Sequence, residues 1–231
     1  MDDYVDEATL PRKAARWLKE IEGFNTHDMP IVPEKTALLV IDMQYFFLDP
    51  ASPSFTCGGL AILPVLQRLI REFRAARLPV IYTRHVHHPD HIDSGLMGTW
   101  WRGMCIEGTP ESEVHRDLAP QPGEKVVLKH RYSAFYNTDL ETILRCQGIQ
   151  HLVITGIMTN MCCESTARDA YFRDYRVSFL ADGTGSITEE MQQASLLNLC
   201  FGFAHVTLAE NVIEQLRQTS REASPAGASA A

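Results

Sequence analysis

Residues 151–170 read HLVITGIMTNMCCESTARDA, and this stretch decides the fold because a short apolar strand turns directly into a helix. Its first five residues have the length and β-branched content of a buried strand, which ends at Gly156. Asn160 is then the predicted N-cap of a helix that carries Cys162 and Cys163 in its first turn. The partial positive charge of a helix N-terminus favours a thiolate, so the junction predicts a reactive cysteine. The alternative is that both thiols only fill core space.

The same alternation of strand and helix recurs along the chain. Apolar runs at residues 37–41, 79–83, 126–128, 152–155, 177–180 and 205–208 are expected to be strands. Helical periodicity is present at residues 63–73, 140–146, 165–175, 189–199 and 209–216. Alternation of this kind is typical of a mostly parallel sheet covered on both faces. The sequence therefore predicts an α/β fold of three layers, α/β/α, with a six-stranded, mostly parallel, Rossmann-like sheet and helices on both faces.

The chain is expected to consist of one large domain with a segment at each end. Residues 1–34 are predicted to be an N-terminal arm, 35–217 the domain, and 218–231 a flexible tail of small and polar residues. The arm carries one weak apolar stripe, made of Ala14, Leu18 and Ile21. This stripe suits packing on the domain or on a neighbouring subunit.

Composition excludes several classes of function. The 231 residues include 21 Lys plus Arg against 29 Asp plus Glu, a net charge of −8, which argues against a nucleic-acid partner. There is no secretory leader pattern and no apolar run of the length of a membrane span, so no membrane partner and a cytoplasmic location are expected. The six cysteines show no disulfide rhythm and are expected to be reduced.

Three of the predicted strands are followed by a reactive residue. Asp42 follows the first strand, Lys129 the third, and Cys162 lies just beyond the fourth. Because parallel strands place their carboxyl ends at one edge of the sheet, these residues are expected to meet there. Taken one at a time, Asp42 is explained as a strand-end cap, Lys129 as a solvated charge and Cys162 as a core thiol. Together they predict a cysteine hydrolase, in which Asp42 moves the thiol proton and Lys129 supplies positive charge.

Three motifs in this order resemble those of the isochorismatase-like cysteine hydrolases, over roughly Lys35 to Leu216. The motifs are LLVIDMQYFF, LKHRYSAFYNTDL and TGIMTNMCCESTARDAY. The resemblance implies that Asp42 is the general base and acid, Lys129 the electrostatic partner and Cys162 the nucleophile. It also implies a non-proline cis peptide at Ile157-Met158 and an oxyanion hole made by the backbone N–H groups of Met158 and Cys162.

The cysteine favours one chemistry within this family. The resemblance implies hydrolysis of a C–N bond of a small amide or ureide through a thioester, without a cofactor. Two alternatives remain open: a vinyl ether hydrolase of the isochorismatase type, in which Cys162 is incidental, and a catalytically idle binding or scaffold member of the fold. Family habit implies a homo-oligomer, dimer or tetramer.

The substrate pocket is expected around the long connection at residues 84–125, which shows no clear periodicity. The predicted substrate-binding residues are Gln44, Phe47, Trp100, Trp101, Arg102 and Tyr132. For the tryptophans and the arginine, packing at the sheet edge or at a subunit contact is an equal alternative.

A cluster of histidines after the second strand suggests a metal site. The cluster consists of His85, His87, His88 and His91. Metal-binding nicotinamidases of the family use an Asp-x-His pair and a later histidine. Alignment places Val86 and Met104 at two of these three positions, so no metal is expected, and solvated or substrate-facing histidines are the default.

Overall fold

One six-stranded sheet forms the centre of the molecule. The computed structural model describes residues 3–101 and 103–222, and within them the strand order is β3-β2-β1-β4-β5-β6, with every neighbouring pair parallel. The strands are β1 Thr36–Ile41, β2 Val80–His85, β3 Lys125–Lys129, β4 His151–Ile157, β5 Arg176–Gly185 and β6 His205–Thr207. The predicted α/β fold with a six-stranded Rossmann-like sheet is confirmed.

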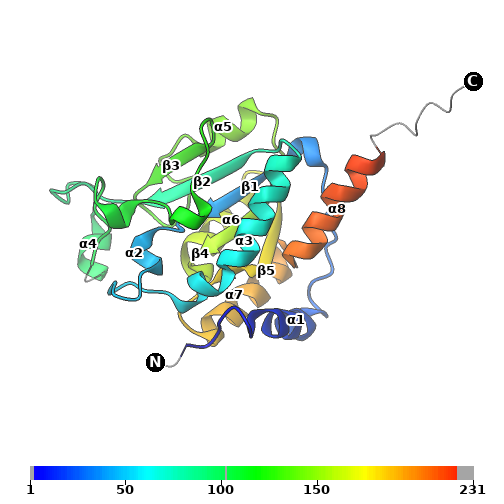
Figure 1. Cartoon of the computed structure of the whole chain (residues 1–231), viewed down its shortest axis with the longest axis horizontal. Coiled ribbons are helices and arrows are strands. Elements are labelled where there is room, and N and C mark those ends of the chain that lie inside the picture. The colour runs from blue at the N-terminus through cyan, green and yellow to red at the C-terminus, as the bar shows by residue number, and fades with distance from the viewer. Residues whose placement is uncertain (1–2, 102, 223–231) are drawn as a thin grey trace, which may run out of the picture.

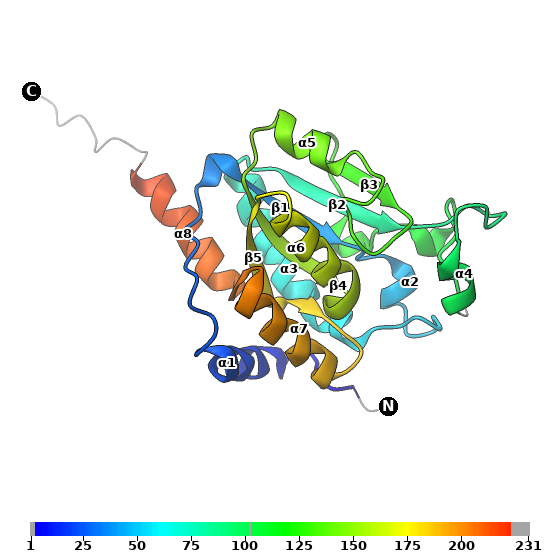
Figure 2. The ribbon, with the colours of Figure 1, turned by 180° about the vertical axis from the view of Figure 1, so that it is seen from behind.

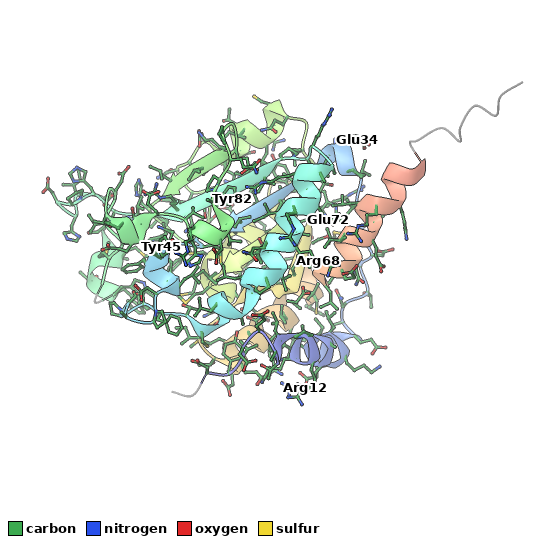
Figure 3. All side chains as sticks on the ribbon, in the orientation of Figure 1. Arg12, Glu34, Tyr45, Arg68, Glu72 and Tyr82 are labelled. Carbon is green, nitrogen blue, oxygen red and sulfur yellow. The ribbon has the colours of Figure 1, made fainter. Side chains whose placement is uncertain are left out.

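Helices cover both faces of this sheet. They are α1 Leu10–Ile21, α2 Tyr45–Leu48, α3 Cys57–Ala75, α4 Leu96–Trp100, α5 Leu140–Cys146, α6 Glu164–Tyr171, α7 Glu189–Gly202 and α8 Ala209–Glu222. Figure 1 shows α3 and α8 in front of the sheet, and Figure 2, from behind, shows α5, α6 and α7 on the opposite face. Arg68 and Glu72 lie on α3 (Figure 3) and form ion pairs with Glu210 and Arg217 of α8.

The central strands explain why the sequence pattern was clear. Every residue of β1 and β4 is buried, because both faces of these strands are covered by helices. Such strands read as continuous apolar runs rather than as alternating patterns. The edge strand β3 has exposed residues, and its apolar run in the sequence is correspondingly short.

The fifth strand is longer than its apolar run predicts. It continues from the expected Leu180 to Gly185, where it pairs again with β4 after a register shift between Ile154 and Gly156. Gly156 has φ +111°, and a Cβ there would lie 2.0 Å from the carbonyl oxygen of Ile41. Only glycine permits β4 to pass this close to β1. The irregular end of β4 thereby brings the following turn next to the end of β1.

The N-terminal arm packs on the domain of its own chain. Helix α1 buries Leu10, Ala14, Trp17 and Ile21, so the predicted stripe is real but includes the tryptophan, and Leu18 is only partly buried. Lys13 Nζ and Trp17 Nε1 both reach the carboxylate of Glu189 at the start of α7, at 2.7 and 2.8 Å.

At the other end of the chain, α8 continues to Glu222, into the segment predicted as a tail. Residues 223–231 of that segment lie outside the described residues. No helix in the described ranges combines the length and apolar character needed to cross a bilayer.

Candidate active site

Asp42 lies at the end of β1 in a strained backbone conformation. Its φ is +51°, in the left-handed region that aspartate tolerates better than most residues. The side chain is fully buried, and Thr83 Oγ1 of the neighbouring strand donates a 2.6 Å hydrogen bond to Asp42 Oδ1. The other oxygen, Oδ2, lies 2.7 Å from Lys129 Nζ. The carboxylate is therefore fixed between a hydroxyl and an ammonium group.

Lys129 is the last residue of β3 and is completely buried. Its ammonium group lies 3.2 Å from Cys162 Sγ, 3.1 Å from His85 Nδ1 and 3.1 Å from the Arg131 carbonyl oxygen. Burial alone would lower the pKa of Lys129, but the Asp42 carboxylate and the hydrogen bonds to Asp42 and Cys162 outweigh it, and the pKa lies above its ordinary value. Lys129 therefore stays positively charged although its own side chain has no exposed surface.

Cys162 lies in a π-helical turn, Thr159–Cys163, that leads directly into α6. This arrangement corrects the expected cap at Asn160: the flanking residue before the turn is Met158, and no side chain caps it. The peptide bond between Ile157 and Met158 is cis, as the resemblance implies. Asn160 instead accepts a 2.7 Å hydrogen bond from Ser186 Oγ.

The environment of Cys162 differs from that expected at a helix N-terminus. Burial raises the pKa of the thiol to about 12, Asp42 contributes in the same direction, and Lys129 opposes them. The resting sulfur is therefore a neutral thiol beside a carboxylate that can accept its proton. Cys163 has no exposed surface, and its sulfur points back toward the Thr155 carbonyl oxygen at 3.9 Å. Of the two cysteines, Cys162 is the one that lines the cavity described below.

A chain of hydrogen bonds leads away from Lys129. Lys129 donates to His85 Nδ1, so the hydrogen of the neutral His85 ring lies on Nε2. His85 Nε2 is 3.1 Å from His87 Nε2, which must accept, and His87 Nδ1 then donates to Asp93 Oδ1 at 3.2 Å. Burial, together with the charge of Lys129, holds the pKa of His85 well below its ordinary value. Burial also lowers the pKa of His87, although Asp93 opposes this.

The predicted histidine cluster is divided in two by the structure. His85 and His87 are buried in this chain, whereas His88 and His91 are exposed. The sequence did not predict the contact of His85 with Lys129. The signal that could have revealed this contact is the register of the two parallel strands, because His85 of β2 is paired with Lys129 of β3.

Two groups of described side chains bring atoms of metal-ligand type together, and both are engaged in hydrogen bonds or ion pairs. His87, Asp93 and His130 bring ligand-type atoms within 4.8 Å of one another. However, His130 Nδ1 donates to the Val86 carbonyl oxygen at 2.7 Å and His87 Nδ1 donates to Asp93, so both nitrogens carry a hydrogen instead of a lone pair for an ion. A second group, made of Asp42, His85 and Cys162, surrounds the ammonium of Lys129, which already occupies the place of a cation.

A cavity of about 440 Å³ opens beside Cys162. Of the predicted substrate-binding residues, Phe47, Trp100, Trp101 and Tyr132 line it, and Trp101 Nε1 donates to the Tyr132 hydroxyl at 3.0 Å. Arg102 lies outside the described residues. The cavity wall also includes residues that the sequence did not single out: Phe55, Met97, Met161 and Ile187.

Gln44 differs from the expected substrate contact. It is fully buried and does not line the cavity. Its amide nitrogen donates to the Ser112 and His85 carbonyl oxygens, at 2.9 and 3.2 Å, and its oxygen accepts from the His85 N–H at 2.7 Å. Gln44 therefore fixes the end of β2, and with it the position of His85.

Comparison with known proteins identifies the family to which this arrangement belongs. The isochorismatase domain matches residues 36–211. The chain belongs to the isochorismatase family. It is accordingly an isochorismatase-family hydrolase, and the resemblance seen in the three sequence motifs is confirmed.

Three relatives of this family show how similar the chain is to its members. Nicotinamidase 3 of Arabidopsis thaliana is 39% identical over 173 residues, which cover 74% of this chain and 83% of that protein. Ureidoacrylate amidohydrolase RutB of Caulobacter segnis is 32% identical over 204 residues, or 78% and 85% of the two chains. The crystal structure of a cysteine hydrolase from Pseudomonas syringae pv. phaseolicola 1448A superimposes with a TM-score of 0.80 at 33% identity, and covers 83% of this chain and 96% of that one.

Proposed function

We propose that this hydrolase cleaves a C–N bond of an amide or ureide through a thioester on Cys162. The observation that carries the proposal is the position of the Cys162 thiol, 3.2 Å from the Lys129 ammonium group and beside the Asp42 carboxylate. The names of two relatives support it, since one is a nicotinamidase and another a ureidoacrylate amidohydrolase.

In the first half of the proposed reaction, Asp42 accepts the thiol proton as Cys162 Sγ bonds to the carbonyl carbon. The carbonyl oxygen becomes an oxyanion, for which the backbone N–H groups of Met158 and Cys162 are the proposed donors. Asp42 then returns the proton to the leaving nitrogen. The C–N bond breaks, ammonia or an amine leaves, and the acyl group remains on sulfur as a thioester.

In the second half, Asp42 accepts a proton from water as the water oxygen bonds to the thioester carbon. The C–S bond then breaks, and the departing sulfur recovers the proton from Asp42. The sum is amide plus water to acid plus ammonia or amine. Lys129 stays charged throughout, so it stabilises the anionic sulfur and holds Asp42 in place.

Replacement of the sulfur tests this function. Cys162→Ala should lower kcat/KM by at least about 10³-fold on the best amide in a screen for ammonia release, because the nucleophile is lost. Cys163→Val is the matched control, since it changes the adjacent buried thiol at similar volume, and it should keep nearly full turnover. Mass spectrometry of rapidly quenched wild-type protein should detect the acyl group on the peptide that contains Cys162.

Two outcomes would contradict the proposal. Full amide turnover by the Cys162→Ala protein would show that the reaction needs no thioester on Cys162. Consumption of isochorismate at an unchanged rate by the same variant would favour the ether hydrolase, in which the sulfur is incidental.

A further inference from the structure

The cavity beside Cys162 is walled by aromatic and sulfur-containing side chains from separate parts of the chain. Phe46, Phe47 and Phe55 come from α2 and the segment that follows it, and Trp101 and Tyr132 come from the connections on either side of β3. At about 440 Å³ the cavity has the size of pockets that enclose a drug-sized ligand. A single small ring would leave much of this apolar wall uncovered.

The part of this wall that the structure describes is uncharged. None of the described residues that line the cavity is an arginine, lysine, aspartate or glutamate. The titratable groups that face it are His85, His87, Cys105, Cys162 and Tyr132. Burial holds the pKa of both histidines below its ordinary value and raises that of Cys105 to about 12. Both histidines and both cysteines are therefore neutral near pH 7.

The charged pair below the cavity does not offer a site for an anion. Lys129 is already paired with Asp42 at 2.7 Å, so a carboxylate on the substrate would meet a neutral ion pair rather than a free cation. Removing a carboxylate from water without a positive partner is unfavourable. An uncharged apolar group placed against the same wall gains free energy from burial instead.

The wall of the cavity offers a ligand few polar contacts. Tyr132 accepts from Trp101 Nε1, and its own hydroxyl hydrogen has no acceptor among the described residues. This hydrogen can be donated to one polar atom of a ligand. Among the described lining residues, Ser54 and Trp100 also carry a hydroxyl and an indole N–H, so the wall combines a few donors with a much larger apolar surface.

We infer that the cavity takes an amide whose acyl group is uncharged, hydrophobic and larger than one ring, and that it disfavours anionic ureido acids and small heteroaromatic amides. The inference rests on the proposed function for turnover, but the binding preference follows from the wall alone. Among the two relatives compared by sequence, neither name describes such a substrate.

A pair of benzamides that differ only in the para substituent tests the effect of charge. Wild-type protein should hydrolyse 4-methylbenzamide with a kcat/KM roughly 100-fold above that for 4-carboxybenzamide, because only the second brings an unpaired charge into the cavity. 2-Naphthamide should exceed nicotinamide, because it covers more of the apolar wall. Ammonia release provides the rates.

Binding is measured separately so that failure of the chemistry and failure of the inference can be distinguished. Calorimetry with the Cys162→Ala protein should give the same order of affinities for these amides. The inference would stand if binding followed this order while no amide was hydrolysed, and only the proposed function would then be lost. Equal or tighter binding of 4-carboxybenzamide, or of nicotinamide over 2-naphthamide, would overturn the inference.

Two further variants examine the wall itself. Met97→Lys places a cation in the wall and should raise the relative kcat/KM for 4-carboxybenzamide about 10-fold, whereas Met97→Leu, which keeps volume and polarity, should not. If wild-type protein prefers the anionic amide and Arg102→Ala abolishes that preference, Arg102 supplies the charge and the inference is wrong.

Discussion

At the scale of single residues, Lys129 is the group around which the candidate site is arranged. Its ammonium group carries three hydrogens but lies within 3.2 Å of four partners: Asp42, His85, Cys162 and the Arg131 carbonyl oxygen. One partner is therefore always weakly bonded. When Cys162 becomes an anion in the proposed reaction, the hydrogen bonds of Lys129 can shift toward sulfur without movement of the backbone.

The hydrogen bonds that run from His85 through His87 to Asp93 keep His85 Nδ1 free to accept a hydrogen bond from Lys129. If Asp93 offers no acceptor, His87 can place its hydrogen on Nε2, which turns the hydrogen of His85 toward the ammonium group. Asp93→Ala should therefore lower kcat roughly 3- to 10-fold with little change in KM.

Asp93→Asn is the matched control for this prediction. It keeps an acceptor oxygen for His87 and should restore most of the lost kcat. Steady-state kinetics measure both constants, and histidine ¹⁵N chemical shifts report the tautomers. An equal loss of kcat in both variants would contradict the proposed role of these hydrogen bonds, since it would mean that only the charge of Asp93 matters.

Prediction from the sequence succeeded for residues whose place follows from a strand end. Asp42, Lys129 and Cys162 were expected at one sheet edge and do lie together there, although their catalytic roles remain proposals. Gln44 could not be placed in the same way, because its partners at Ser112 and His85 belong to distant segments. The neutral state of the Cys162 thiol likewise depends on burial beside Asp42, which no local pattern reveals.

At the scale of elements, the sheet contains a partly buried carboxylate that links a strand to a helix. Asp182 of β5 accepts a 2.9 Å hydrogen bond from the N–H of Ala209, the first residue of α8. Burial raises the pKa of Asp182 to about 6. The folded state thus binds this proton more tightly than the unfolded chain does. The contribution to stability is complete at about pH 4 and is lost as the pH rises through 6.

Asp182→Asn removes this dependence on pH while it keeps an oxygen acceptor for Ala209. The variant should match wild type at pH 4 and be more stable at pH 8, by roughly 2 kcal/mol in the free energy of unfolding, because the buried charge is absent. Urea denaturation at the two pH values measures this difference. A variant less stable than wild type at pH 8 would show that the charge on Asp182 stabilises the fold.

The elements themselves were predicted unevenly. Helix α5 begins and ends where its periodicity predicts, because a surface helix shows its apolar stripe directly in the sequence. The end of β5 was missed because residues 181–185 read as a turn, and their strand conformation depends on pairing with β4. The π-helical turn at Thr159–Cys163 has no sequence signature either, so the cap was wrongly expected at Asn160.

At the scale of the whole molecule, the N-terminal arm is connected to the turn that carries Cys162. Tyr4 Oη accepts a 3.1 Å hydrogen bond from the N–H of Ser186, and Ser186 Oγ donates to Asn160 in the π-helical turn at 2.7 Å. From the sequence, the arm was expected to pack either on its own domain or on a neighbouring subunit. This contact belongs to the first alternative.

Tyr4→Phe should weaken both the fold and the site. The N–H of the buried Ser186 loses its acceptor, so the free energy of unfolding should fall by about 1–2 kcal/mol. Because Ser186 also holds Asn160, kcat should fall as well. Tyr136→Phe, at a tyrosine that is 55% exposed, is the matched control and should change neither. Thermal melts and amide turnover measure the two effects. If the Tyr4→Phe protein is less stable but has an unchanged kcat, the arm stabilises the fold without affecting catalysis.

The cavity wall and the three residues proposed to carry the reaction come from different parts of the chain. Asp42, Lys129 and Cys162 sit where strands end, whereas much of the wall is supplied by residues 46–55, 97–101 and 103–105, in the connections between strands. Selectivity and bond cleavage can therefore diverge independently during evolution. A mutant library confined to these connections should yield many folded enzymes with new amide preferences, whereas one spread over the strand ends should yield mostly inactive proteins.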